Sequence, residues 1–107
     1  MIEQIFKLAD SNGSKVVEMV INDENIHYNH MILPSGEGLP VHKTNPTIYM
    51  TVVRGTLTIT LNEQESNVYE KGTILKIPKG ITMHARNEHG DILELLVVKA
   101  PAPTAHI

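Results

Sequence analysis

The sequence contains no cysteine, which excludes disulfide bonds, cysteine-ligated zinc and a thiol nucleophile. It has no tryptophan and one phenylalanine, so a platform for stacking nucleic-acid bases is not expected. Positive charge is not in excess, because nine Lys and Arg against twelve Asp and Glu give a net charge of −3. No apolar run reaches membrane-spanning length, and the start, MIEQIFKLAD, lacks a signal-peptide pattern. We expect a soluble cytoplasmic protein that binds neither nucleic acid nor membrane.

The 107 residues suffice for one domain, and their pattern predicts strands and no long helix. Alternation is clearest over Thr56–Leu61, and Val16–Ile21 and Ile26–Leu33 are strand-like. Turn-forming residues separate such runs at short intervals, at Asp10–Ser14, Asn22–Asn25, Pro34–Pro40, Lys43–Pro46, Asn62–Asn67, Glu70–Gly72, Pro78–Gly80 and Asn87–Asp91. The pattern predicts an all-β barrel or sandwich.

One predicted strand, Ile92–Val98, is apolar on both faces apart from Glu94. A strand of this kind is buried on both sides, and a small barrel covers only one side with its own core. We expect the second side to pack against another copy of the chain, with help from the segment Ile2–Leu8, to form a homodimer.

Two groups of spaced residues resemble the two short motifs of the cupin superfamily. Five residues separate a glycine from His42 in the first group, and the second group has a glycine, five residues, and then Pro-x-Gly. The framework positions in register with the motifs are Gly36, Gly55, Gly72, Pro78, Gly80 and Asn87. The resemblance implies a single cupin domain over residues 1–107, a jelly-roll double-stranded β-helix with its barrel core at about residues 26–100.

Cupins of the usual kind hold a divalent metal inside the barrel through three histidines and a glutamate. This sequence keeps only His42 of those ligands, because Thr44, Ile48 and Met83 stand at the other three positions. One imidazole and a hydroxyl are too few ligands for tight binding, and a thioether suits soft metals. We expect no metal or other cofactor.

A divalent metal held by displaced histidines is the alternative. His84 lies one residue beyond the family's position, and in a regular strand it faces away from the lumen unless a β-bulge turns it inward. His27 and His30 are three residues apart, so at most one faces inward. A site of His42, His84 and His30, or His27 in its place, would indicate an oxygenase or isomerase. His89 and His106 are interpreted as solvated.

The lumen is otherwise predicted to be apolar. Ile48, Met50 and Val52 share the parity of His42 if the strand is regular, and Met83 fills the same space. The residues favour a barrel that binds a small apolar or amphipathic molecule, with His42 as polar anchor and Thr44 nearby. A metal-dependent enzyme and a scaffold whose barrel is filled by its own side chains are the competing interpretations, and whether any reaction is catalysed is left open.

Overall fold

A computed structural model describes residues 1–10 and 13–103 and contains nine strands. They are β1 (Val16–Asn22), β2 (His27–Leu33), β3 (His42–Lys43), β4 (Thr47–Arg54), β5 (Thr56–Leu61), β6 (Asn67–Glu70), β7 (Ile74–Ile77), β8 (Thr82–Arg86) and β9 (Leu93–Ala100). No helix occurs among the described residues, which confirms the all-β prediction. That part of the chain therefore has no helix that could cross a membrane.

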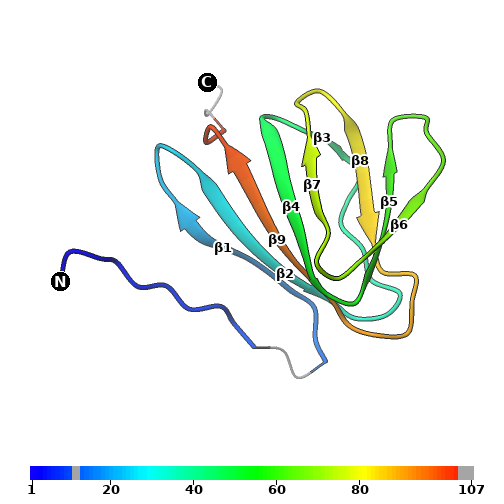
Figure 1. The fold of residues 1–107 in the computed structure, drawn as a ribbon, viewed down its shortest axis with the longest axis horizontal. Helices are drawn as coiled ribbons and strands as arrows, with labels where there is room; N and C mark the ends of the chain where they lie inside the picture. Colours follow the sequence, from blue (N-terminus) through cyan, green and yellow to red (C-terminus); the bar gives the residue numbers. More distant parts are fainter. Residues whose placement is uncertain (11–12, 104–107) are drawn as a thin grey trace.

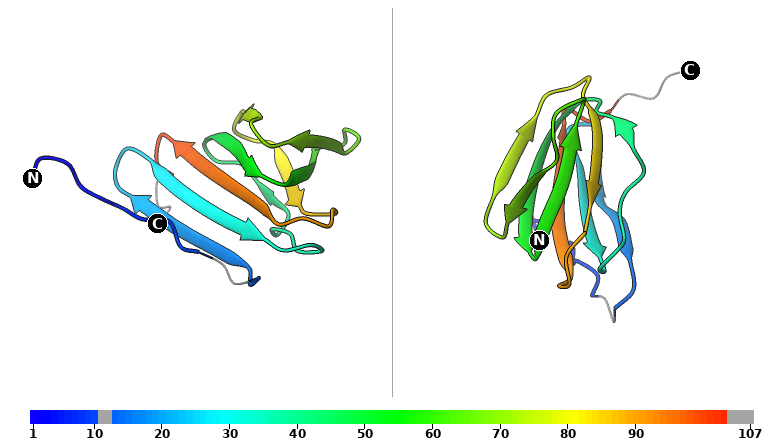
Figure 2. Two further views of the ribbon diagram at one scale, coloured as in Figure 1. Left: turned by 60° about the horizontal axis from the view of Figure 1, so that its bottom comes forward. Right: turned by 90° about the vertical axis from the view of Figure 1, so that its right-hand side faces the viewer.

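The strands form two antiparallel sheets that face each other (Figure 1). The larger sheet has the order β1-β2-β9-β4-β7, and the smaller sheet has the order β3-β8-β5-β6. Neighbours far apart in sequence, such as β2 with β9 and β4 with β9, make the jelly-roll connectivity (Figure 2). The strand β1 lies at an edge of the larger sheet, outside the predicted barrel core of about residues 26–100.

The core lies between the sheets and follows the period-two alternation of the strands. Ile48, Met50 and Val52 on β4 are fully buried, as their shared parity predicts. The same holds on β9, where the inward residues are Leu93, Leu95 and Val97. Glu94, Leu96 and Val98 then lie on the outer face of the larger sheet.

One end of the barrel is closed by two local devices. The buried Asn87 donates from Nδ2 to the carbonyls of Leu33 (2.9 Å) and Asp91 (2.7 Å), and its Oδ1 accepts from the amide of His89 (2.9 Å). Gly55 has φ of +80°, and a Cβ there would lie 2.2 Å from the carbonyl oxygen of Ile92. Both framework residues therefore pack the strand ends tightly together.

Some sequence predictions fall partly outside the described residues. The turn at Asp10–Ser14 includes residues 11 and 12, and His106 lies in residues 104–107, so neither is described. Residues 1–10 form an extended segment and no strand.

Candidate ligand-binding lumen

A small cavity of about 40 Å³ lies between the sheets. Its lining is apolar except for two residues and consists of Met31, Leu39, His42, Ile48, Met50, Met83, Val97 and Lys99. The six apolar residues are buried, whereas His42 and Lys99 are half-buried. The two polar side chains therefore mark the mouth through which the cavity meets solvent.

The strand pairing explains why these residues meet. His42 on β3 is the cross-strand partner of Met83 on β8, so both face the lumen. Met50 on β4 is the partner of Val97 on β9, and Ile48 is the partner of Lys99. The sequence pattern predicts His42, Ile48, Met50 and Met83 in one lumen, and the structure brings these four together.

His42 is held by a backbone contact at the mouth. Its Nδ1 lies 3.1 Å from the carbonyl oxygen of Pro40. A carbonyl only accepts, so Nδ1 carries the proton in this contact and Nε2 is the nitrogen left for a ligand. The ring is thus oriented rather than free to rotate.

Thr44 does not join the lumen lining. Its hydroxyl donates to the carbonyl of Pro78 (2.8 Å) and accepts from the amide of Ile81 (2.9 Å). Thr44 is therefore a buried support for the loop before β8 and lies outside the lining of this cavity, so its contact with a ligand stays a prediction.

The residues at the family's metal positions do not fit a divalent metal. Only His42 supplies a nitrogen, Ile48 and Met83 supply an alkyl group and a thioether, and the hydroxyl of Thr44 is already bonded. Among the described residues, no group of three or more His, Asp or Glu side chains is arranged so that it could hold a metal ion.

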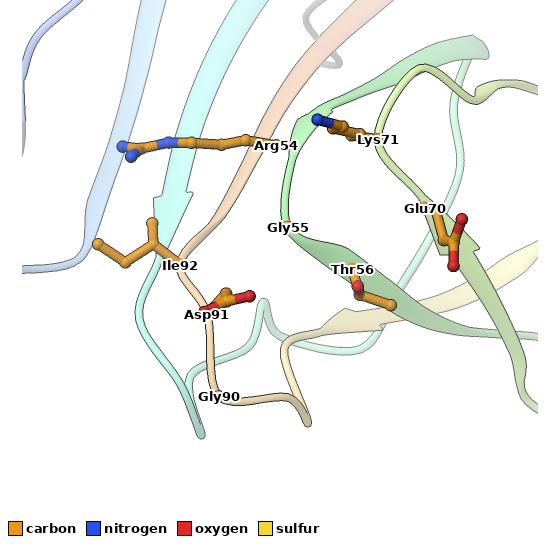
Figure 3. A pocket seen from close by; sticks show the side chains of 8 residues that line it. All are labelled: Arg54, Gly55, Thr56, Glu70, Lys71, Gly90, Asp91 and Ile92. Atoms are coloured by element: carbon orange, nitrogen blue, oxygen red, sulfur yellow. The ribbon is translucent and has the colours of Figure 1, made fainter.

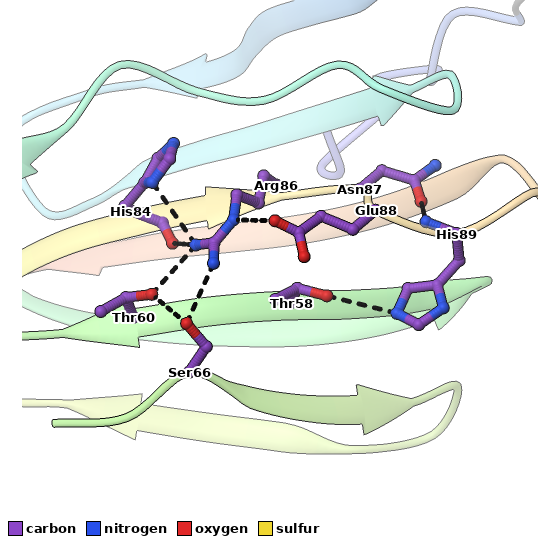
Figure 4. Close-up of polar contacts among 8 residues, drawn as sticks. All are labelled: Thr58, Thr60, Ser66, His84, Arg86, Asn87, Glu88 and His89. Carbon is purple, nitrogen blue, oxygen red and sulfur yellow. Dashed lines mark hydrogen bonds and ion pairs between the residues drawn. The ribbon is translucent and has the colours of Figure 1, made fainter.

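The alternative site of displaced histidines is not formed. His84 lies on the regular strand β8 between the buried Met83 and Ala85, so it faces outward. There it belongs to a polar network around Arg86 on the outside of the smaller sheet (Figure 4). His30 faces outward from the larger sheet, and His27, which shares the inward parity of Met31, begins β2. The three histidines of the alternative thus lie on different faces.

His89 is not simply solvated. It is half-buried, and its Nε2 lies 3.2 Å from the hydroxyl of Thr58 (Figure 4). The interpretation of His89 as a free turn residue is therefore corrected.

A charged network on the outer face of the larger sheet was not predicted. His30 has no exposed surface, and its Nδ1 and Nε2 lie 2.7 Å from Glu18 and 2.6 Å from Glu94. Arg54 Nε donates to the other oxygen of Glu94 at 2.9 Å. Two carboxylates on one ring require both ring nitrogens to donate, so the geometry is that of an imidazolium.

The pKa values of this network follow from the contacts. Burial taken alone lowers the pKa of His30, but the hydrogen bonds that its ring donates to Glu18 and Glu94, together with the negative charges of these carboxylates, outweigh it and raise the pKa above its usual value. The bond from His30, and next the amide of Ala9, lowers the pKa of Glu18.

A wider depression lies at the opposite, closed end of the barrel (Figure 3). It measures about 700 Å³ and is bordered by Arg54, Lys71, Glu70 and Asp91 together with backbone of the Gly55 turn. Arg54 is engaged by Glu94, and the remaining charges have mixed sign. The depression therefore favours neither an anionic nor a cationic ligand.

Several lumen residues were not predicted from the sequence, and Lys99 matters most among them. The inward direction of Lys99 could have been predicted, because it alternates in step with Leu93, Leu95 and Val97 along an apolar strand. Met31 and Leu39 could not be placed, because their contact with the lumen depends on how the sheets pack.

The two facing sheets and the turn framework define a cupin-type double-stranded β-helix. No protein-family model matches the chain. The uncharacterized protein MJ0764 of Methanocaldococcus jannaschii is 39% identical over 103 residues, which are 96% of this chain and 89% of that protein. Its crystal structure, described as an RmlC-like cupin family protein, aligns with a TM-score of 0.92 over 96% of this chain and 94% of that one. The chain therefore belongs to the RmlC-like cupin family.

More distant structures agree in fold alone. A double-stranded β-helix protein from Klebsiella pneumoniae aligns with a TM-score of 0.80 at 18% identity, covering 94% of this chain and 91% of that one. A cupin superfamily protein from Desulfitobacterium hafniense aligns with a TM-score of 0.75 at 10% identity, covering 87% and 83%. These likenesses confirm the cupin fold expected from the turn framework.

Proposed function

We propose that this cupin is a binding module for a small amphipathic molecule whose head group is anionic. The observation that carries the proposal is the make-up of the lumen, in which His42 and Lys99 flank the mouth of an otherwise apolar cavity. A carboxylate at the mouth would accept from Lys99 and from a protonated His42, while its alkyl tail would lie among the methionines.

The cavity of about 40 Å³ has room for on the order of one water molecule, so a ligand must displace side chains. Three of the lining residues are methionines, Met31, Met50 and Met83. Their unbranched thioether chains have three rotatable bonds and re-pack at low energetic cost. The methionines therefore support an adaptable lumen.

One buried polar atom near the lumen supports the binding of a polar group or a water molecule there. Asn29 is buried on β2, and its Oδ1 has no hydrogen-bond partner among the described residues. Its cross-strand partner Val97 lines the cavity. A buried acceptor without a donor is costly, and a ligand hydroxyl or a bound water would satisfy it.

A scaffold whose barrel is filled by its own side chains is the second candidate, and the small cavity volume favours it. Ligand pockets usually measure about 300–1,000 Å³. The two candidates differ in what saturating ligand does to the melting temperature.

The test uses straight-chain carboxylates from butanoate to octanoate, with the matching alcohols as uncharged controls, in thermal melts and calorimetric titrations. We expect carboxylates to raise the melting temperature and alcohols to have a smaller effect. Lys99→Met should weaken carboxylate binding about tenfold, whereas Lys43→Met, on the exposed neighbour of His42, should not. If no carboxylate shifts the wild-type protein while Met50→Ala gains binding, the barrel is self-filled and the proposal fails.

A further inference from the structure

The inner face of β2 carries one buried polar group that no described residue satisfies. Side chains alternate along a strand, so Asn29 lies on the same face as Met31, which lines the cavity. Asn29 is 7% exposed. Among residues 1–10 and 13–103, its Oδ1 is the only buried side-chain nitrogen or oxygen atom without a hydrogen-bond partner. Because buried acceptors are nearly always paired, this one indicates a donor supplied from outside the chain.

Strand pairing places Asn29 one step inside the mouth of the lumen. Asn29 is the cross-strand partner of Val97, which lines the cavity. The next inward pair toward the mouth is His27 with Lys99, and inward residues of one strand are about 7 Å apart. Lys99 at the mouth and the amide of Asn29 therefore lie on adjacent steps of the same wall.

Asn29 borders the cavity without lining it, so a ligand reaches its Oδ1 by displacing a neighbouring side chain. The cavity of about 40 Å³ has room for on the order of one water molecule, so a ligand displaces lining side chains in any case. Met31, the neighbour of Asn29 on β2, has an unbranched thioether chain that re-packs at low energetic cost. Displacement of Met31 would extend the cavity to the amide of Asn29.

The polar groups on this side of the lumen are donors at the mouth and an acceptor one step deeper. Lys99 only donates hydrogen bonds, the Nε2 of His42 donates when the ring is protonated, and the Oδ1 of Asn29 only accepts. We propose that the amphipathic anion of the proposed function, on which this inference rests, is a hydroxy carboxylic acid. Its carboxylate lies at Lys99 and His42, and its hydroxyl donates to the Oδ1 of Asn29.

The spacing of these groups favours a hydroxyl close to the carboxylate. In a 3-hydroxy acid a single carbon atom separates the carboxyl carbon from the carbon that bears the hydroxyl, so the two polar groups lie within one step of about 7 Å along the wall. A hydroxyl at the far end of the chain would instead lie among Ile48, Met50 and Met83, which offer it no side-chain oxygen or nitrogen. Burial of a hydroxyl without a partner is costly, so such a ligand is disfavoured.

A site of this kind distinguishes mirror images. The carboxylate is held at the mouth, the alkyl tail lies along the apolar lining, and the acceptor for the hydroxyl is on the wall formed by β2. The carbon that bears the hydroxyl therefore has three of its substituents directed by the protein. Only one enantiomer of a 3-hydroxy acid can direct its hydroxyl at Asn29 while the other two contacts are kept.

The first test is a calorimetric titration of the wild-type protein with octanoate, the two enantiomers of 3-hydroxyoctanoate, and 8-hydroxyoctanoate. One enantiomer should bind at least about fivefold more tightly than octanoate, because a net hydrogen bond contributes about that factor. The other enantiomer should bind no more tightly than octanoate. The terminal hydroxyl of 8-hydroxyoctanoate should make it bind more weakly than octanoate.

Variants then assign the preference to one side chain. Asn29→Leu removes the acceptor at nearly constant size and should make the favoured enantiomer bind no more tightly than octanoate, with Asn29→Ala as a second variant if the first does not fold. Lys99→Met should weaken both ligands but keep their ratio, because it acts on the carboxylate that they share. Asn67→Leu, at an exposed position on β6, is the matched control and should keep the full preference.

The outcomes separate this ligand class from the proposed function. If octanoate binds but neither enantiomer binds more tightly, or if the preference survives in the Asn29 variants, the hydroxy-acid proposal is overturned and the proposed function stands. If neither octanoate nor any hydroxy acid binds, both are overturned.

Discussion

Replacing His30 by alanine should make stability both lower and nearly independent of pH above pH 6. The ring bridges Glu18 on β1 and Glu94 on β9 at 2.7 and 2.6 Å, so the substitution removes two charge-assisted hydrogen bonds. It also leaves two carboxylates without the cation between them. Arg54 continues to neutralise one of them, Glu94.

The magnitude follows from these contacts. A hydrogen bond to a charged group contributes about 1.5–3 kcal/mol, but both carboxylates are partly exposed and regain water when the ring is lost. We therefore expect a loss of about 2–4 kcal/mol at pH 6, or about 10–20 °C in melting temperature for a domain of this size.

The sign of the pH dependence follows from the raised pKa of His30. The contribution is fully present below the unfolded value of about 6.5 and is lost as pH rises through the higher folded value. Glu18, whose pKa is lowered, contributes above its unfolded value and loses that contribution in acid. Wild-type stability should therefore be highest between about pH 5 and 6.5 and fall toward pH 9.

The assay is urea unfolding at fixed protein concentration from pH 5 to 9, because association would shift apparent stability. His84→Ala is the matched control, since His84 also lies on an outer sheet face but its ring makes a longer contact, 3.4 Å to Arg86. A wild-type stability that is flat from pH 6 to 9, or a His30→Ala loss no larger than that of His84→Ala, would contradict this prediction.

Two further predictions concern the turn framework and the lumen. Gly55→Ala should lower the free energy of unfolding by about 2–4 kcal/mol and Gly72→Ala by about 1 kcal/mol, measured by urea unfolding. Both glycines have positive φ, but only at Gly55 would the added Cβ contact backbone atoms. Equal losses would contradict this prediction. The double substitution Ile48→Glu and Met83→His should make a three-ligand site with His42, so Ni²⁺ or Zn²⁺ at 100 times its dissociation constant should add about 2.7 kcal/mol. The apo variant should be less stable than wild type, and a chelator should leave the wild-type melting temperature unchanged. No metal response in the double variant would mean that these side chains do not converge.

The local sequence pattern was sufficient to predict the fold and half of the residues that line the lumen. Turn residues at fixed spacings set hairpin geometry, and period-two parity put Ile48, Met50 and Val52 on one face, so both could be predicted from neighbours in sequence. The outward direction expected of His84 in a regular strand followed from the same parity and is observed.

Long-range pairing explains what was missed. The network around His30 joins residues 12 and 64 positions away, and only the strand order β1-β2-β9 brings them together. The single charge in the apolar strand Ile92–Val98 is Glu94, which the sequence marked as an exception but could not pair. Likewise, the contact between His89 and Thr58 depends on how a loop lies over β5.

The closure of one barrel end by Asn87 affects how a ligand would enter and leave the lumen. Because this side chain ties β2 and the loop before β9 together, we expect a ligand of the proposed kind to reach the lumen from the side of His42 and Lys99. The ligand would enter tail first and leave head first by the same route, so two ligand molecules could not pass each other. One ligand molecule would then have to leave before the next could bind. Its residence time would depend on the contacts at His42 and Lys99 rather than on those with the apolar lining.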